Sequence, residues 1–284
     1  MHFEKWQALG NDYVIVDAAD LPAALTPAAV RALCDRHTGI GADGVLLLQP
    51  PDEPGFVARL RIFNPDGSEA ELSGNGAREA ILYLRRRGWT DRDRFSIQTI
   101  AGEIRPTILS DTTCRVDMGR ARDNGPGKVE SGGRVWRYRH ISIGNPLCAM
   151  EVPSLEDLDG LDLAAIGPAI EHAPQFPDRT NVSWFSELAP GVIRARIFER
   201  GVGETTASGT GACGAAIASV LRGGDPTVTV KLDGGELEVD VGEDLHVDLT
   251  GWAVPVYTGQ LSGELLDDLG ASDGDGVRAQ RVVE

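Results

Sequence analysis

The stretch ARLRIFNPDGSEAELSGNGA, residues 58–77, decides the fold because the chain contains it twice. The second copy is IRARIFERGVGETTASGTGA, residues 193–212, and it matches the first without a gap at a separation of 135 residues. Nine of the twenty positions are identical, including the serine and both glycines of the terminal pentapeptides SGNGA and SGTGA. We interpret the copies as a duplication. Because 135 residues is a common domain size, we expect two lobes of similar fold.

Length, composition and charge limit the classes of protein to consider. The chain has 284 residues, of which 42% are hydrophobic and 25% charged, as in ordinary globular domains. Its net charge of −16 argues against a nucleic acid or an anionic membrane as partner, because the field of the protein repels both. No apolar run approaches ~18 residues, and the start MHFEKWQALG lacks a signal-peptide pattern. We therefore expect no membrane contact and a cytoplasmic location.

The residue types that most often bind metals are dispersed along the chain. The four cysteines show no C-x-x-C spacing and the five histidines form no ligand pattern. We expect reduced thiols and no metal site. The cysteines are Cys34, Cys114, Cys148 and Cys213.

Short strand-like runs alternate with a few helices in both halves, which is typical of an α+β fold. Each pentapeptide ends a loop and opens a helix, so we expect each lobe to be a strand-rich sheet wrapped around one central helix. Glycine, proline and polar residues interrupt the apolar pattern at 121–133. We predict an N-terminal lobe over residues 1–120 and a C-terminal lobe over 121–262, whose last strand is available to pack on the first lobe. Residues 263–284 lose all periodicity and are predicted to be a disordered tail.

Ser73 and Ser208 are predicted to lie at the N-termini of the two central helices. Free backbone N–H groups and the positive end of the helix dipole favour an anion there, and glycines let a ligand approach the backbone. Two such helix ends facing one cleft would hold one carboxylate from both sides. The alternative is that each serine is only an N-cap, worth ~1 kcal/mol.

Six stretches in this order resemble the diaminopimelate epimerase family, whose members invert an α-carbon without pyridoxal phosphate. The resemblance covers residues 1 to about 260 and implies two pseudo-symmetric lobes, a buried site between them, no cofactor and a homodimer. It implies interconversion of LL- and meso-diaminopimelate by abstraction and return of the α-proton. A pyridoxal enzyme is disfavoured because no lysine lies in these stretches. They are ALGNDYVIVD (8–17), GIGADG (39–44), FNPDGSEAELSGNGAR (63–78), GNP (144–146), RTNV (179–182) and ERGVGETTASGTGAC (199–213).

The resemblance also implies roles for individual residues on both sides of the site. An arginine faces the distal carboxylate of the substrate, an acidic residue lies beside the second catalytic position, and backbone donors hold the reacting carboxylate. Turn chemistry is the alternative for the asparagines, notably the two that precede proline. The implied catalytic residues are Ser73, Ser208 and Glu199. The implied substrate-binding residues are Asn11, Gly44, Asn64, Gly74, Asn75, Asn145, Asn181, Glu199, Arg200, Gly209 and Thr210.

Four positions depart from the family pattern. The family has a cysteine pair where this chain has Ser73 and Ser208, a histidine where it has Leu147, and a different residue at Glu79. A thiol has a pKa near 8.5 that a helix N-terminus lowers into the working range, whereas a serine hydroxyl needs an adjacent base. We expect Glu199 to assist Ser208, and we identify no assisting residue for Ser73.

Three functions stay open on the sequence alone. The first is a diaminopimelate epimerase, either slow on its serines or carrying engineered cysteine-to-serine changes. The second is a lyase or one-base isomerase on the same fold. The third is a non-catalytic binder of an amino acid.

Overall fold

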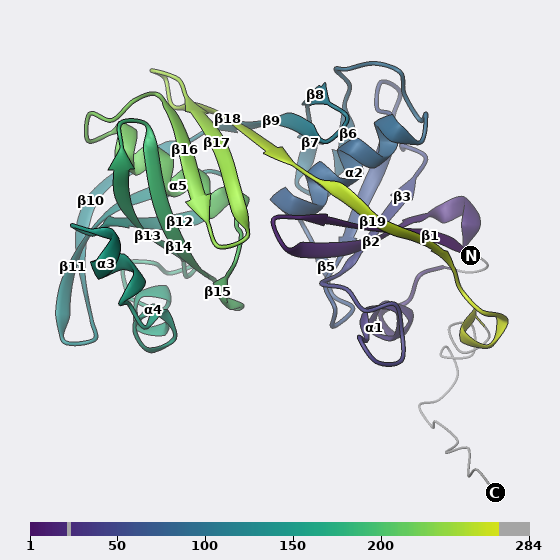
Figure 1. The fold of residues 1–284 in the computed structure, drawn as a ribbon, viewed down its shortest axis with the longest axis horizontal. Helices are drawn as coiled ribbons and strands as arrows, with labels where there is room; N and C mark the ends of the chain where they lie inside the picture. Colours follow the sequence, from purple (N-terminus) through teal and green to yellow (C-terminus); the bar gives the residue numbers. More distant parts are fainter. Residues whose placement is uncertain (22–23, 267–284) are drawn as a thin grey trace, which may run out of the picture.

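Two strand-rich lobes lie side by side, each with a helix against its sheet (Figure 1). The computed structural model describes residues 1–21 and 24–266. The predicted α+β fold with two pseudo-symmetric lobes is confirmed. Within the described ranges, none of the helices has the length and apolar character that a bilayer crossing requires.

The first lobe is built on an eight-stranded sheet. Its strand order is β19-β1-β2-β3-β4-β6-β7, with β5 paired to β4. The pairs β2/β3 and β4/β6 are parallel, and the other pairs are antiparallel. The strands are β1 (His2–Ala8), β2 (Asn11–Asp17), β3 (Val45–Gln49), β4 (Ala58–Phe63), β5 (Glu69–Ala70), β6 (Ile97–Thr99), β7 (Gly102–Ile104) and β19 (Val254–Gln260). The helices are η1 (Ala18–Asp20), α1 (Pro27–Cys34) and α2 (Gly74–Arg86).

The second lobe is built on an eleven-stranded sheet of order β10-β11-β12-β13-β14-β16-β17-β18-β9-β8, with β15 paired to β14. Here β12/β13 and β14/β16 are the parallel pairs. The strands are β8 (Pro106–Ser110), β9 (Thr113–Arg120), β10 (Arg122–Ser131), β11 (Arg134–Ser142), β12 (Pro146–Glu151), β13 (Asn181–Ala189), β14 (Val192–Glu199), β15 (Gly203–Thr205), β16 (Thr227–Leu232), β17 (Gly235–Val241) and β18 (His246–Trp252). The helices are α3 (Leu155–Asp159), α4 (Leu163–Glu171) and α5 (Gly209–Val220).

The duplication seen in the sequence is a duplication of structure. In each lobe a strand of the repeat is followed by a short strand paired to it, then by the central helix, then by a parallel strand on the other side. The helix starts Gly74 and Gly209 differ by the same 135 positions as the repeat, and each follows a serine N-cap. The local sequence therefore encodes the same strand–turn–helix unit twice.

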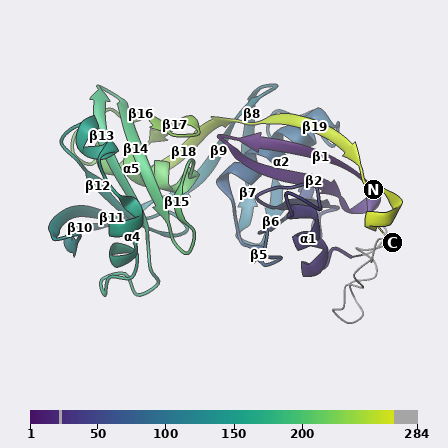
Figure 2. The same cartoon turned by 60° about the horizontal axis from the view of Figure 1, so that its bottom comes forward.

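The chain passes between the lobes at two places. Strands β8 and β9 belong to the second sheet, although they lie before residue 120. Strand β19 leaves the second lobe after β18 and pairs antiparallel with β1, as Figures 1 and 2 show. The lobe bounds at 120 and 262 stay a prediction; the second sheet continues across residue 120, because β9 and β10 both belong to it. Residues 263–266 of the predicted tail form a helical turn, and 267–284 lie outside the described residues.

The central helix of the first lobe buries two charged side chains beside each other. Arg78 and Glu79 are both fully buried in the second turn of α2. Neither carboxylate oxygen of Glu79 has a hydrogen-bond partner in the described part of the chain. Burial raises the pKa of Glu79 well above its ordinary value of 4.5, and the nearby guanidinium of Arg78 offsets only part of that effect.

Replacing Glu79 with glutamine should raise the free energy of unfolding, and the gain should grow with pH. A folded-state pKa above 4.5 means that the stability contributed by protonated Glu79 is complete below 4.5 and is lost as pH rises towards the folded pKa. The difference between variant and wild type should increase by ~1.4 kcal/mol per pH unit in that window. Urea unfolding at several pH values measures it, with the exposed Glu243→Gln as control. A gain independent of pH would contradict the assignment.

Candidate active site

The two helix N-termini carry matched serine caps. Ser73 and Ser208 both have extended backbone angles, with φ of −131° and −143°. The Oγ of Ser73 accepts a hydrogen bond from the backbone N–H of Gly76 at 3.1 Å, and the Oγ of Ser208 accepts one from Gly211 at 3.2 Å. Each hydroxyl therefore caps its helix while its remaining hydrogen-bonding capacity is available to neighbours.

The two helices start face to face. A methyl group built on Gly74 would lie 3.5 Å from the Cα of Gly209, and one built on Gly209 would lie 3.6 Å from the Cα of Gly74. Both positive helix ends therefore point at one small volume between the lobes. This arrangement attracts an anion to the free N–H groups of both first turns.

A buried guanidinium lies directly behind these helix ends. Arg78 donates from Nη1 to the carbonyl of Gly74 at 3.0 Å and from Nη2 to the Oδ1 of Asn75 at 2.6 Å, while its Nε has no partner in the described ranges. A methyl group on Gly251 of β18 would lie 2.9 Å from that Nε, so the glycine makes room for it. Burial lowers the pKa of Arg78. We did not identify Arg78 from the sequence, although it closes the stretch 63–78.

Glu199 is the partner of Ser208. Ser208 is 4% exposed, and its hydroxyl donates to the Oε2 of Glu199 at 3.0 Å. Burial raises the pKa of Glu199, and the hydrogen bond from Ser208 opposes that shift. A carboxylate in this place can accept the hydroxyl proton when Ser208 takes one from a substrate.

Tyr13 is the partner of Ser73. Its hydroxyl, from strand β2, donates to the Oγ of Ser73 at 3.1 Å. Burial raises the pKa of Tyr13 above its ordinary value of 10.0. We missed this residue in the sequence, although it lies within ALGNDYVIVD; no spacing signal links positions 60 residues apart. Leu147 is buried against Gly214 of α5 and offers no proton-accepting atom.

Hydrogen bonds link several predicted site residues in the first lobe. Asn75 donates to the Oδ1 of Asn11 at 3.2 Å, and Asn11 donates to Asp43 at 2.9 Å. Gly44 lies beside them: a methyl group there would come within 2.6 Å of the Tyr13 ring. By contrast, Asn64 bonds within its own turn, to Gly67 and Ser68, as turn chemistry predicts.

The remaining predicted residues meet in the second lobe. Asn145 donates to the Oγ1 of Thr210 at 3.2 Å, and its Oδ1 has no partner within residues 1–21 and 24–266. Asn181 accepts the backbone N–H of Arg200 at 2.9 Å. The guanidinium of Arg200 donates to the carbonyl of Asp178 at 2.8 Å. These contacts place amide and guanidinium groups from the residue before β12, the first residue of β13 and the residue after β14 on the same side of the lobe as the start of α5.

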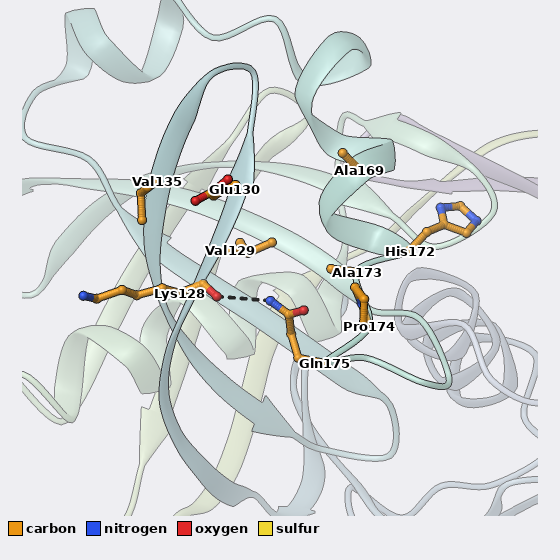
Figure 3. Close-up of a pocket in the computed structure, with 9 residues that line it drawn as sticks. All are labelled: Lys128, Val129, Glu130, Val135, Ala169, His172, Ala173, Pro174 and Gln175. Carbon is orange, nitrogen blue, oxygen red and sulfur yellow. Dashed lines mark hydrogen bonds between the residues drawn. The ribbon is translucent and has the colours of Figure 1, made fainter.

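A separate pocket of about 610 Å³ lies on the second lobe, between the β10–β11 hairpin and the end of α4 (Figure 3). Gln175 in its wall donates to the carbonyl of Lys128 at 3.1 Å. None of the predicted site residues lines it. We therefore assign the candidate site to the junction of the two helix ends, where the serine caps and their partners meet.

Solved structures with the same fold come from several enzyme groups. A phenazine biosynthesis protein of the PhzF family from Bacillus anthracis matches with a TM-score of 0.70 and 19% sequence identity, covering 92% of this chain and 99% of that one. A probable proline racemase from Agrobacterium radiobacter matches with a TM-score of 0.69 and 17% identity, covering 92% and 93%. At these identities the likeness concerns the fold alone.

Sequence comparison is more specific. The family profile for diaminopimelate epimerase matches residues 3–123 and 139–261. The diaminopimelate epimerase of Pelotomaculum thermopropionicum is 42% identical over 281 residues, which cover 92% of this chain and 98% of that protein. The diaminopimelate epimerase of a Synechococcus strain is 42% identical over 278 residues, covering 91% and 97%. Together with the duplicated lobes and the facing helix ends, these matches show that the chain belongs to the diaminopimelate epimerase family.

Proposed function

We propose that this chain is a diaminopimelate epimerase, which interconverts the LL and meso forms by removing and returning the α-proton without a cofactor. The observation that carries the proposal is the pair of facing helix N-termini, each capped by a hydroxyl with its own polar partner. The names of the relatives at 42% identity support the choice of substrate. The homodimer and the cytoplasmic location stay part of the proposal.

The α-carboxylate of the substrate would lie between the two helix ends. The first-turn N–H groups of Gly74, Asn75, Gly209 and Thr210 are donors for it. When the α-proton leaves, negative charge moves into that carboxylate, so preorganised donors and dipoles stabilise the transition state more than the ground state. The buried guanidinium of Arg78 adds positive potential at the same place.

On the second-lobe face, Ser208 and Glu199 supply the base. The Oγ of Ser208 takes the α-proton while its own proton passes to Glu199 across the 3.0 Å hydrogen bond. On the first-lobe face, Ser73 returns a proton to the opposite side of the carbon. A serine is a much weaker acid than a cysteine, so we expect slow turnover. One-base exchange is the second candidate function, because Ser208 has a carboxylate partner and Ser73 has none.

The rest of the site suits a long substrate with a second charged end. Asn145, Asn181 and Arg200 supply amide groups and a guanidinium beyond the helix junction, and Asn64 is the remaining candidate. Guanidinium groups bind carboxylates with two parallel hydrogen bonds. Short amino acids should therefore bind poorly.

The double change Ser73→Cys and Ser208→Cys should raise kcat for epimerisation about a hundredfold, because thiol pKa values lie nearer to working pH. Chiral chromatography of both stereoisomers after incubation measures the rate. The exposed Ser110→Cys is the control for an added thiol. The serine assignment fails if the wild type already reaches ~10 turnovers per second and the double variant is no faster.

The variant Glu199→Gln should lower kcat/KM about a hundredfold by removing the proton acceptor of Ser208. In the wild type, activity requires ionised Glu199, so kcat/KM should fall as pH falls through a pKa raised above 4.5. The Glu199→Gln variant should no longer show this fall of kcat/KM at low pH. The control variant at an exposed position, Glu187→Gln, should keep both the wild-type kcat/KM and its fall at low pH. An unchanged pH profile in Glu199→Gln would exclude this residue as the acceptor.

The variant Arg200→Ala should weaken diaminopimelate binding about ten- to a hundredfold, the usual effect of losing a charge-assisted hydrogen bond. Isothermal titration calorimetry measures the affinity. Arg222, which pairs with Glu151 at the surface, provides the control Arg222→Ala. Equal affinity for diaminopimelate and alanine in the wild type would contradict the assigned role of Arg200.

A further inference from the structure

We propose that Tyr13 is the positioning residue of the first-lobe half of the site, where its hydroxyl fixes Ser73 so that Ser73 presents its proton to the α-carbon. The inference rests on the proposed function and adds to it one residue, Tyr13, and the direction of proton transfer at each serine. It assigns opposite resting roles to the two serines.

The hydrogen bonds of Ser73 leave only its capacity to donate a proton free for the substrate. A hydroxyl has two acceptor lone pairs and one donor. The backbone N–H of Gly76 and the hydroxyl of Tyr13 both donate to the Oγ of Ser73, each at 3.1 Å. A phenol is a stronger acid than an alcohol, so Tyr13 is the favoured donor of this pair. With Tyr13 donating, both acceptor positions of Ser73 are filled, and Ser73 can only donate towards the cleft.

The hydrogen bonds of Ser208 leave its capacity to accept a proton free for the substrate. Among the described residues its Oγ accepts the N–H of Gly211 alone, and its proton goes to Glu199. One lone pair therefore remains for a proton from substrate. Inversion needs one face deprotonating and the other protonating, and the two partners, Glu199 and Tyr13, supply that difference.

The tyrosine is held firmly as a donor. Tyr13 is 6% exposed in β2, and its ring lies against Gly44, where a methyl group would clash at 2.6 Å. Three acidic groups act on it: Glu79 from α2, Asp43 before β3 and Glu199 from β14. Burial and these acidic groups raise the pKa of Tyr13 by more than its hydrogen bond with Ser73 lowers it, so its hydroxyl keeps its proton.

The proton balance closes with solvent water as the only further reactant. The α-proton passes to Ser208 and the Ser208 proton to Glu199, while the Ser73 proton passes to the other face of the α-carbon. Ser73 is left as an alkoxide that keeps two hydrogen bonds, from Tyr13 and Gly76, at the positive end of α2. Exchange with solvent water then returns a proton to Ser73 and removes one from Glu199, which restores both groups for the next turnover.

The first test follows α-proton exchange of each diaminopimelate isomer in deuterated water. In Tyr13→Phe, exchange of the isomer whose proton faces Ser73 should fall about tenfold or more, the cost of a hydrogen bond to a charged group. Exchange of the other isomer should stay within about twofold. The matched control is Tyr83→Phe, a half-buried tyrosine on α2 that packs on Trp6. Equal losses for both isomers, or none, would overturn the inference.

The second test needs no turnover. In Ser73→Cys, the Tyr13 hydroxyl should stabilise the introduced thiolate, and adding Tyr13→Phe should raise the thiol pKa by about one unit. The pH dependence of alkylation by iodoacetamide gives that pKa, and mass spectrometry locates the label, because the four native cysteines are buried. Melting temperatures confirm that each variant is folded.

The two tests distinguish a failure of the Tyr13 inference from a failure of the proposed epimerase activity. A wild type that exchanges neither isomer would overturn the proposed epimerase activity, and the thiol pKa then decides the Tyr13 contact alone. An unchanged thiol pKa in the Tyr13→Phe background overturns the inference even in an active enzyme.

Discussion

The close approach of two positive helix ends is the constraint on which the rest of the structure depends. Two N-termini whose Gly74 and Gly209 nearly touch repel one another unless an anion lies between them. The lobes must therefore be held together by other means in the free protein. Strand β19 and the β8–β9 hairpin do this, because each continues from one lobe into the sheet hydrogen bonds of the other. The two positive helix ends are thereby kept close together, where a carboxylate that binds between them relieves their repulsion.

Buried charge reinforces the same constraint. The guanidinium of Arg78 hydrogen-bonds to Gly74 and Asn75, so it fixes the backbone and side chain at the start of α2. In the part of the chain that the structure describes, no carboxylate hydrogen-bonds to this guanidinium, although Glu79 is adjacent in sequence and equally buried. Unpaired buried charges cost free energy. A protein keeps such groups most readily where their field serves binding or catalysis, as it would here behind the carboxylate position.

The two halves of the site are alike in backbone and different in chemistry. Duplication produced the same serine cap on both helices, with the same bond to the N–H three residues on. The partners differ because they come from non-equivalent places: Glu199 ends a strand of the repeat, whereas Tyr13 comes from β2, outside the repeated stretch. A symmetric fold thereby acquires the asymmetry that proton removal on one face and return on the other require.

The sequence alone determined the duplication, the starts of both central helices and the serine caps, because each cap depends on a hydrogen bond spanning only three residues. It also led to Glu199, which lies nine positions before Ser208 and contacts it through a short strand turn. Only the tertiary structure revealed Tyr13, which reaches Ser73 across 60 positions, and the pairing of β8 and β9 into the second sheet. The sequence placed Arg78 at the end of the stretch 63–78, but it did not indicate that the side chain is buried. Such contacts follow from how sheets and helices pack in space, and local periodicity carries no record of that packing.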